Sequence, residues 1–405
     1  MAELMKYFAF LFITQFSFGQ EIALENQLLW EISGNGLKQK SYLYGSFHTN
    51  DKRVFKLSDS TYYAINRADA IVLETDVTEL FVEWDTRRDD VQLFYDENGN
   101  PYTSSRNASK TLYGNEDGMP QFLDAYFHQY CFNAGKVFYP LETVQDQLDL
   151  LGGKSDYIPS YNEMESRVVS QEKVLDLYLK GDIYGLDKLM RTSLMVYPGL
   201  YDELILDRNK LMTQGIDTLL QQKSLFIAVG AGHLAGEKGI INLLRAKGYK
   251  LRKVTSIFST YPTEEKERFL QAREYKYTNN ELGLNAIFPG KPVIYDEKEN
   301  AWKMIYREMG QGNTYQIEVI EKNEGTLESV ASDYIRSPRT SKISIKQMDE
   351  GAHYAEGLSD TYPEGLSWIR IIEAENHMVI IKTYGGNKYM NSKRPQSFFN
   401  KVWIE

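Results

Sequence analysis

Two of the five histidines in the chain have matching local surroundings. His48 ends the run GSFH and His233 ends the run GAGH, so each closes a Gly-x-x-His motif. Glu74 follows the apolar run IVL, where a carboxylate needs a partner. Two neutral imidazoles and one carboxylate form a three-ligand set for a divalent ion that leaves a position open for water, as hydrolytic metal sites require. The pattern therefore indicates metal-dependent hydrolysis.

Each of these residues follows a predicted strand. Alternating or apolar runs predict strands over 41–45, 70–73 and 224–229, immediately before His48, Glu74 and His233 respectively. Ligands gather at the carboxyl ends of strands in α/β folds. We therefore expect the three side chains to meet at one edge of a sheet.

The surrounding pattern predicts an α/β domain. Strands over 28–33 and 41–45 flank the turn sequence GNG, a strong hairpin signal, and a closing strand is expected over 250–255. The stretch 79–118 is polar and is interpreted as an insertion or lid. Helices are predicted over 58–68, 119–132, 162–180, 184–194, 200–221 and 236–247. A mixed sheet with a helical layer follows from this order.

Beyond about residue 260 the pattern changes. Period-2 alternation over 314–320 and 368–372 predicts antiparallel strands, with one helix expected over 325–335. We expect a small α+β domain with no catalytic set. The predicted organisation is a signal peptide over 1–19, a hydrolase domain over 20–260, a linker over 261–280 and a C-terminal α+β domain over 281–405.

Composition narrows the classes of function. The 405 residues carry a net charge of −10 and show no basic stripe, which argues against a nucleic-acid partner. Cys131 is the single cysteine, so multi-cysteine zinc or iron–sulfur sites within one chain are excluded. Any metal chemistry must use histidine, carboxylate and water.

The N-terminal residues predict export. Lys6 precedes an apolar run, and small residues at Ser17 and Gly19 fit a signal-peptidase cleavage after Gly19. No stretch reaches the roughly 20 apolar residues that a membrane-spanning helix needs. We expect a periplasmic or secreted protein without stable membrane insertion.

Taken together, the motifs resemble the TraB/GumN family, which includes the TIKI-like metalloproteases. The resemblance runs over 25–258 and rests on LWEI, SYLYGSFH, IVLE, the pair Arg208-Asn209 and VGAGHLAG, in that order. It implies a metal-dependent hydrolase, most simply a peptidase acting on a peptide or protein substrate, with His48, Glu74 and His233 at the metal. Manganese, cobalt and zinc are all compatible with it.

The roles of the individual residues stay open at this point. Glu74 is either a third ligand or the general base for a metal-activated water. Arg208 is suited to a developing oxyanion or a substrate carboxylate, or else to a salt bridge within the helical layer. Asn209 would orient water or cap a turn.

Two other functions would use parts of the same sequence pattern. A non-catalytic cell-envelope protein that binds metal, haem or peptide would use the same residues without turnover. A dinucleotide-binding turn over 230–236 fits poorly, because its third glycine is one residue late and basic residues stand near 252 where a ribose-binding acid belongs.

Overall fold

The structure is a computed structural model. It describes residues 27–49, 51–83, 92–95, 101–104, 123–146, 149, 171–195, 199–258, 273–297, 301–309, 313–322, 325–336, 343–348, 351–361 and 365–405. The predicted signal peptide over 1–19 and most of the predicted linker over 261–280 lie outside these residues.

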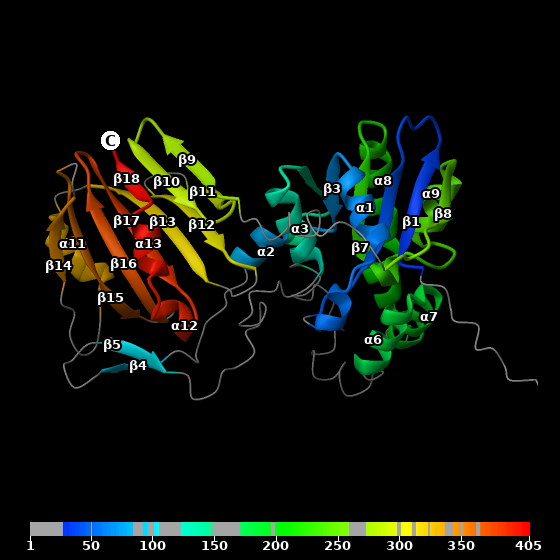
Figure 1. The fold of residues 1–405 in the computed structure, drawn as a ribbon, viewed down its shortest axis with the longest axis horizontal. Helices are drawn as coiled ribbons and strands as arrows, with labels where there is room; N and C mark the ends of the chain where they lie inside the picture. The colour runs from blue at the N-terminus through cyan, green and yellow to red at the C-terminus, as the bar shows by residue number, and fades with distance from the viewer. Residues whose placement is uncertain are drawn as a thin grey trace, which may run out of the picture.

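The N-terminal region is built on a six-stranded mixed sheet with the order β6-β3-β7-β2-β1-β8 (Figure 1). Strands β2, β7, β3 and β6 are parallel, and β1 lies antiparallel to both β2 and β8. The strands are β1 (Leu29–Gly34), β2 (Ser41–Ser46), β3 (Ala70–Leu73), β6 (Val137–Pro140), β7 (Leu225–Gly230) and β8 (Tyr249–Lys253).

The β1–β2 hairpin follows from its turn sequence. Gly34, Asn35 and Gly36 all have positive φ angles, of 79°, 48° and 78°. Glycine and asparagine adopt this conformation at little cost. The hairpin predicted over 28–33 and 41–45 is confirmed, with Leu29 paired to Tyr44.

Helices cover this sheet and extend from it. The predicted helices are confirmed where the structure describes them, whereas 119–122 and 162–170 lie outside the described residues, and 200–221 contains a π-helical segment. The helices are α1 (Asp59–Arg67), α2 (Val77–Glu83), α3 (Leu123–Asn133), α6 (Gln171–Lys180), α7 (Ile183–Leu194), α8 (Arg208–Leu220) and α9 (Ile240–Ala246), with the short turns η1 (Lys52–Phe55), η2 (Asp202–Asp207, π-helical) and η3 (Ala231–His233).

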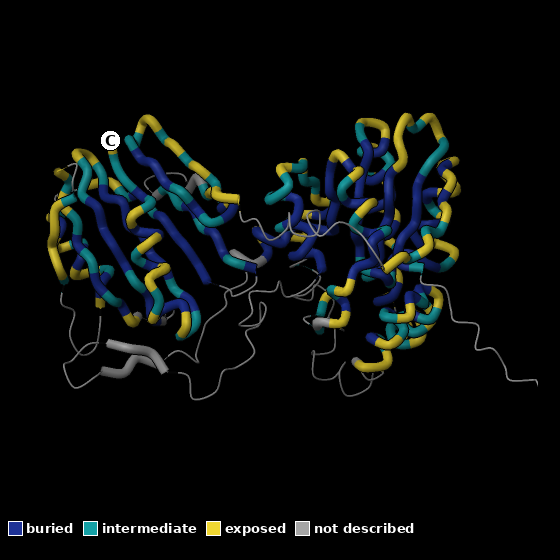
Figure 2. Tube along the Cα trace, in the orientation of Figure 1, coloured by how far each residue is buried: buried dark blue, intermediate teal, exposed yellow. Residues whose placement is uncertain are grey.

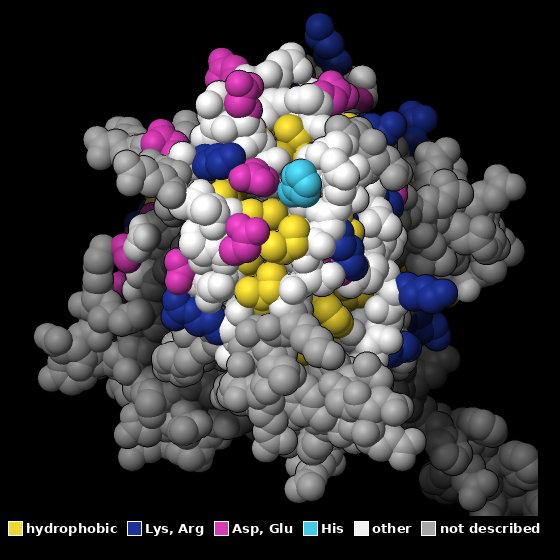
Figure 3. Space-filling model, turned by 90° about the vertical axis from the view of Figure 1, so that its left-hand side faces the viewer, with side chains coloured by type: hydrophobic (Ala, Val, Ile, Leu, Met, Phe, Trp, Pro, Cys, Tyr) yellow, Lys and Arg dark blue, Asp and Glu magenta, His cyan; other side chains and the backbone are white. Residues whose placement is uncertain are grey.

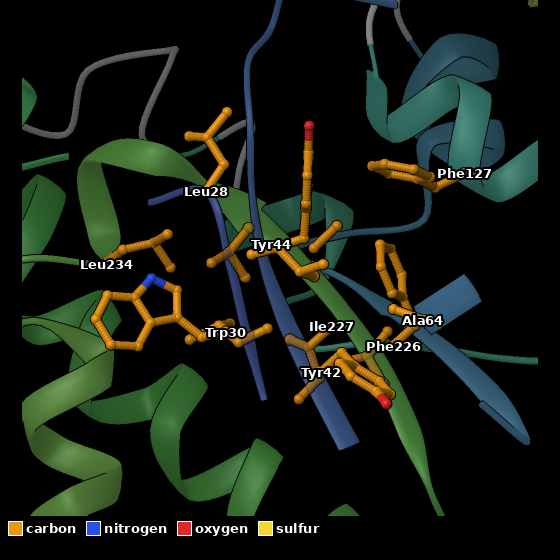
Figure 4. Close-up of a cluster of buried hydrophobic side chains, with 14 of the residues drawn as sticks. Leu28, Trp30, Tyr42, Tyr44, Ala64, Phe127, Phe226, Ile227 and Leu234 are labelled. Atoms are coloured by element: carbon orange, nitrogen blue, oxygen red, sulfur yellow. The ribbon is translucent and has the colours of Figure 1, made fainter. Parts of the chain in front are cut away.

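The core of this region lies on both faces of the central strands. All four residues of β3 are buried, and Figure 4 shows Trp30 and Leu234 on one side of the strands and Tyr44 and Phe127 on the other. The Tyr44 and Phe127 rings meet edge to face, with centroids 5.5 Å apart. Figure 2 shows this burial continuing along the strands.

Three strands and one α-helix of the N-terminal region are absent from the sequence-based expectation. Strand β6 has four residues and lies at the sheet edge, where Val137 is 46% exposed, so its pattern is weak. The stretch 79–118, interpreted from its polarity as an insertion, contains most of α2 and the hairpin of β4 (Gln92–Tyr95) and β5 (Pro101–Ser104).

The C-terminal region consists of antiparallel sheets. One has seven strands, in the order β11-β12-β13-β17-β16-β15-β14, and one has three, in the order β18-β10-β9. Its elements are β9 (Tyr275–Asn279), β10 (Leu284–Phe288), β11 (Val293–Glu297), β12 (Ala301–Arg307), β13 (Thr314–Glu321), α11 (Leu327–Tyr334), β14 (Ser344–Gln347), β15 (His353–Thr361), β16 (Gly365–Glu373), β17 (His377–Tyr384), α12 (Asn387–Met390), α13 (Arg394–Phe399) and β18 (Val402–Ile404). The predicted fold class, a mixed α/β sheet followed by antiparallel strands, is confirmed.

The two regions contact each other through α2 and α3. Val77 of α2, Ala125 of α3 and Met309 beyond β12 form a small buried apolar cluster. The guanidinium of Arg273 also lies over the ring of Phe132, 5.9 Å from its centroid. The C-terminal region therefore packs on the helices that follow β3 and precede β6.

The end of the molecule that carries α11 and β14 is shown in Figure 3. Apolar side chains gather there beside acidic side chains and a histidine. In the part of the chain that the structure describes, no helix has both the length and the apolar character needed to cross a bilayer.

Candidate functional site

The predicted site residues lie at the carboxyl ends of three adjacent parallel strands. His48 follows β2, Glu74 follows β3, and His233 lies in η3 directly after β7. Because β7 lies between β2 and β3 in the sheet, the three strand ends bring these side chains to one edge.

Glu74 is the buried centre of the group. Its side chain is 7% exposed, and its Oε1 accepts a hydrogen bond of 2.6 Å from the backbone N–H of Gly230. Its Oε2 accepts one of 2.8 Å from Nη2 of Arg208. Both oxygens of the carboxylate therefore have a donor.

Arg208 joins two buried carboxylates. Its Nε and Nη2 donate to the two oxygens of Glu142 over 2.8 and 2.7 Å, a bidentate arrangement, while Nη2 also reaches Glu74. Glu142 is anchored in turn, because its backbone N–H donates to the carbonyl of Glu74 over 2.7 Å. Arg208 thus pairs with carboxylates that follow β3 and β6, and not with a residue of the helical layer.

His233 is held by Asn209. Nδ1 of His233 lies 2.7 Å from Oδ1 of Asn209, whose Nδ2 donates to the carbonyl of Lys238 over 2.9 Å. This amide orientation assigns the proton to Nδ1 of the imidazole. Nε2 then carries the lone pair, and it lies 3.8 Å from Oε1 of Glu74.

His48 is held by Asp124 of α3. Its Nδ1 lies 3.0 Å from Oδ2 of Asp124, and the other oxygen of this buried carboxylate accepts a hydrogen bond of 3.1 Å from the Ser46 hydroxyl. The His48 side chain is 54% exposed, whereas His233 is 7% exposed. His48 is thus the member of the group that faces the outside.

Glycines in the two Gly-x-x-His motifs leave room for neighbouring groups to lie close to the backbone. A Cβ on Gly230 would lie 3.2 Å from Oε1 of Glu74 and 3.9 Å from Nε2 of His48, so the missing side chain leaves the space between them. A Cβ on Gly45 would lie 2.9 Å from Leu234, so this glycine lets η3 pack against β2.

The pKa values of Glu74, His233 and His48 are all shifted from their ordinary values, and in different directions. Burial raises the pKa of Glu74, but the positive charges that His233, Arg208 and His48 can carry lower it to about 2. Burial lowers the pKa of His233 to about 4. Desolvation of the ring atoms within the site lowers the pKa of His48, although the side chain as a whole is half exposed, but the charge and hydrogen bond of Asp124 outweigh this effect and raise the pKa to about 9. At neutral pH the group holds an anionic Glu74 and a neutral His233.

Sequence comparison decides the family. The chain matches the TraB/PrgY/gumN family over residues 28–103 and 102–253, which is more than half of its 405 residues. The chain belongs to the TraB/PrgY/gumN family. This match contains all five predicted site residues of the TraB/PrgY/gumN chain and ends before the C-terminal region.

Other comparisons add less. No curated protein matches the sequence. A solution structure of cyanobacterial PsbP (CyanoP) from Synechocystis sp. PCC 6803 is similar at 10% identity and a TM-score of 0.27, over 33% of this chain and 94% of that chain. The fold class of this TraB/PrgY/gumN member is therefore taken from its own strands and helices.

The structure brings all five predicted residues together and adds two. Asp124 and Glu142, which hold His48 and Arg208, were not identified from the sequence of this family member. Glu142 closely follows β6, just as Glu74 follows β3, so recognising that strand would have indicated it. Asp124 lies among apolar residues of α3 and gave no comparable signal.

A π-helical segment precedes the Arg-Asn pair of this TraB/PrgY/gumN chain. Residues Asp202–Asp207 form η2, and α8 continues from Arg208 without a break. Such segments are rare and are frequently found at functional sites.

The donor types fit a divalent ion. Each imidazole has Nδ1 fixed by an acceptor, Asp124 or Asn209, while Nε2 faces the Glu74 side of the group, as metal-ligating histidines require. As the side chains stand, however, the described part of the chain contains no group of three or more His, Cys, Asp or Glu side chains placed to hold a metal. Arg208 is the cation that contacts Glu74 in this arrangement.

Proposed function

We propose that this chain is an exported, metal-dependent hydrolase that cleaves peptide bonds. The observation that carries the proposal is the pairing of two imidazoles, each with Nδ1 fixed, around the buried carboxylate of Glu74. Hydrolytic metal sites use this donor chemistry and this outer support.

His48 and His233 would hold the ion through Nε2. Glu74 is the better choice for a third ligand than for a general base, because a carboxylate whose pKa is about 2 accepts protons poorly. When bound, a divalent ion supplies Lewis-acid polarisation of a carbonyl group and lowers the pKa of water. Arg208 would keep Glu74 ionised and oriented.

Asp124 and Asn209 give the two histidines different surroundings. Asp124 places a negative charge behind the exposed His48, whereas Asn209 places a neutral amide behind the buried His233. A substrate approaching from solvent meets His48 first, because His233 and Glu74 are nearly buried.

The experiment is metal analysis combined with peptide cleavage. Purified protein should bind manganese, cobalt or zinc, cleave members of a peptide library, lose cleavage on chelation and recover it when the ion is restored. His233→Ala and Glu74→Gln should abolish cleavage, and His377→Ala, in β17 of the C-terminal region, is the matched control. Cleavage that survives chelation or His233→Ala would refute the proposal, and stable metal or peptide binding without turnover would favour the non-catalytic alternative.

Export is tested separately. The proposed cleavage after Gly19 predicts that protein recovered from outside the cytoplasm begins at Gln20. N-terminal sequencing checks this, with a chain lacking residues 1–19 expected to stay inside the cell.

A further inference from the structure

A cavity of about 280 Å³ opens beside the histidine and glutamate group but is formed by other residues. None of His48, Glu74, Arg208, Asn209 and His233 lines it. Its walls come from β1, β2, η1, α1, α6 and the chain that follows β8. Seven of the twelve described residues that line it are apolar or aromatic, among them Leu28, Val54, Tyr44, Tyr178 and Phe258, and five are polar, among them Arg53, Lys56 and Ser256.

The cavity lies at the same edge of the sheet as the proposed site. The backbone N–H of Gly45 donates to the carbonyl of Leu28 over 2.9 Å, so the start of β1 lies beside the end of β2. Ser256 and Phe258 follow the end of β8, the next strand in the order β2-β1-β8. Figure 4 shows Leu28 and the ring of Tyr44 extending toward the same end of the strands. The site thus lies at the ends of β3, β7 and β2. The cavity lies along the same edge of the sheet, next to β2, β1 and β8.

The cavity adjoins the part of the chain that carries His48. Two residues that flank this part, Tyr44 and Arg53, both line the cavity. The Tyr178 hydroxyl donates to the carbonyl of Gly45 over 3.0 Å, and its ring stacks on Phe47 with centroids 5.0 Å apart. A group held in the cavity would therefore be one aromatic layer away from the residue that precedes His48.

The lining selects an apolar group. Leucine, valine and aromatic side chains form most of the lining, together with the buried hydroxyl side chains of Ser58 and Thr61. Among the residues that the structure describes, no Asp or Glu side chain lines the cavity. The cation of Arg53 is already paired with Asp51 and Glu172. A basic side chain would lose its hydration here without gaining a counter-charge, whereas an aromatic side chain would bury its surface favourably.

We propose that this cavity is a substrate subsite that holds a large apolar or aromatic side chain next to the bond presented to His48. The inference rests on the proposed peptidase function, because it names the substrate class of that function. Its direct consequence is binding, which is measurable without turnover.

The first experiment measures binding of N-acetyl-phenylalaninamide to the full chain by NMR. Phe258 is 55% exposed, so Phe258→Ala should leave the fold intact and weaken binding about tenfold through lost apolar contact. Ser256→Trp should fill the cavity with its indole ring and abolish binding. Leu211→Trp, on an exposed position of α8, is the matched control and should bind like the parent chain. Binding that is absent from the parent chain, or unchanged in Ser256→Trp, would overturn the proposal.

The second experiment compares cleavage of peptides that differ at one position, Phe against Ala or Lys. The subsite predicts that Phe258→Ala raises KM for the Phe peptide with little change in kcat, and that it leaves the Ala peptide unaffected. If the parent chain cleaves peptides without this dependence, the subsite is wrong and the peptidase function stands. If no peptide is cleaved but the probe binds as described, the peptidase function is wrong and the cavity remains a binding site for apolar groups.

Discussion

The imidazole of His48 is held by the carboxylate of Asp124, with 3.0 Å between Nδ1 and Oδ2. Asp124 is buried and its second oxygen is held by the Ser46 hydroxyl. This contact joins α3 to the end of β2. Because Ala125, the next residue, packs on Met309, the helix that holds His48 also contacts the C-terminal region.

Asp124→Asn should lower the pKa of His48 from about 9 toward its ordinary value of about 6.5, because the charge of Asp124, which raises this pKa, is lost. Because His48 has a higher pKa in the folded than in the unfolded chain, its protonation stabilises the fold. This contribution is fully present below pH 6.5 and is lost as the pH rises through about 9. The stability difference between parent and variant should therefore shrink over that range. NMR titration of His48 and urea unfolding at the two pH limits check it. An unchanged His48 titration would contradict the assigned contact.

Arg208→Gln should be strongly destabilising at neutral pH. It leaves Glu74 and Glu142 as adjacent buried carboxylates without their cation. Breaking a buried ion pair by removing one partner costs about 3–5 kcal/mol. Denaturant unfolding measures the loss, and adding Glu142→Gln to this variant should recover part of it.

The control for Arg208 is Arg53→Gln. Arg53 also bridges two carboxylates, Asp51 and Glu172, but at the surface. Water and salt screen such pairs, so the free energy of unfolding should barely change. If both variants lost the same free energy of unfolding, burial of the ion pairs of Arg208 would not increase their contribution to stability.

Acid should weaken the fold in two steps. His233 has its pKa lowered from 6.5 to about 4, so the unfolded chain takes up a proton first and stability falls as the pH drops through this range. Glu74 has its pKa lowered from 4.5 to about 2, so its contribution is present above pH 4.5 and is lost as the pH falls toward 2. His233→Gln should remove the first step. Unfolding curves between pH 7 and pH 3 that coincide for parent and variant would contradict this assignment.

Gly230→Ala should impair metal binding more than folding. The added methyl group would lie 3.2 Å from Oε1 of Glu74 and 3.5 Å from Cδ2 of His233, in the space between the proposed ligands. We expect a loss of metal affinity, measured by calorimetry, with a thermal midpoint close to that of the parent. Gly325→Ala, whose Cβ would meet its neighbours at 3.4 Å, should change neither quantity. Parent-like metal affinity in Gly230→Ala would place the ion elsewhere.

Much of the fold could be predicted because its strands are buried and its turns are specific. The run of β7 is apolar throughout, and the GNG turn fixes the β1–β2 hairpin. Strand β6 could not be recognised, because its run VFYP is only four residues long and ends in a proline, which counts against a strand.

The five site residues could be predicted because strand ends and local motifs position them. Their outer partners could not. Asp124 and Glu142 are far along the chain from His48 and Arg208, and only the folded sheet and helices bring them within 3.0 and 2.8 Å. A carboxylate that is buried in the fold can be recognised as a site residue only when the cation or imidazole that it contacts is known.

The π-helical segment η2 makes the site sensitive to the number of residues as well as to their identity. A π-helical turn contains one residue more than an α-helical turn, and one residue turns the chain by about 100° around the helix axis. Deleting one residue within Asp202–Asp207 would replace the π-helical turn by a regular α-helix that continues into α8. The residues before η2 would then be rotated about the helix axis relative to the Arg208-Asn209 pair. Arg208 and Asn209 would then face Glu142 and His233 only if the helical residues before η2, which include the buried Leu200, gave up their own packing. A change in the length of this one helix would thus break the contacts of Arg208 and Asn209 with Glu142 and His233 without altering any side chain of the site.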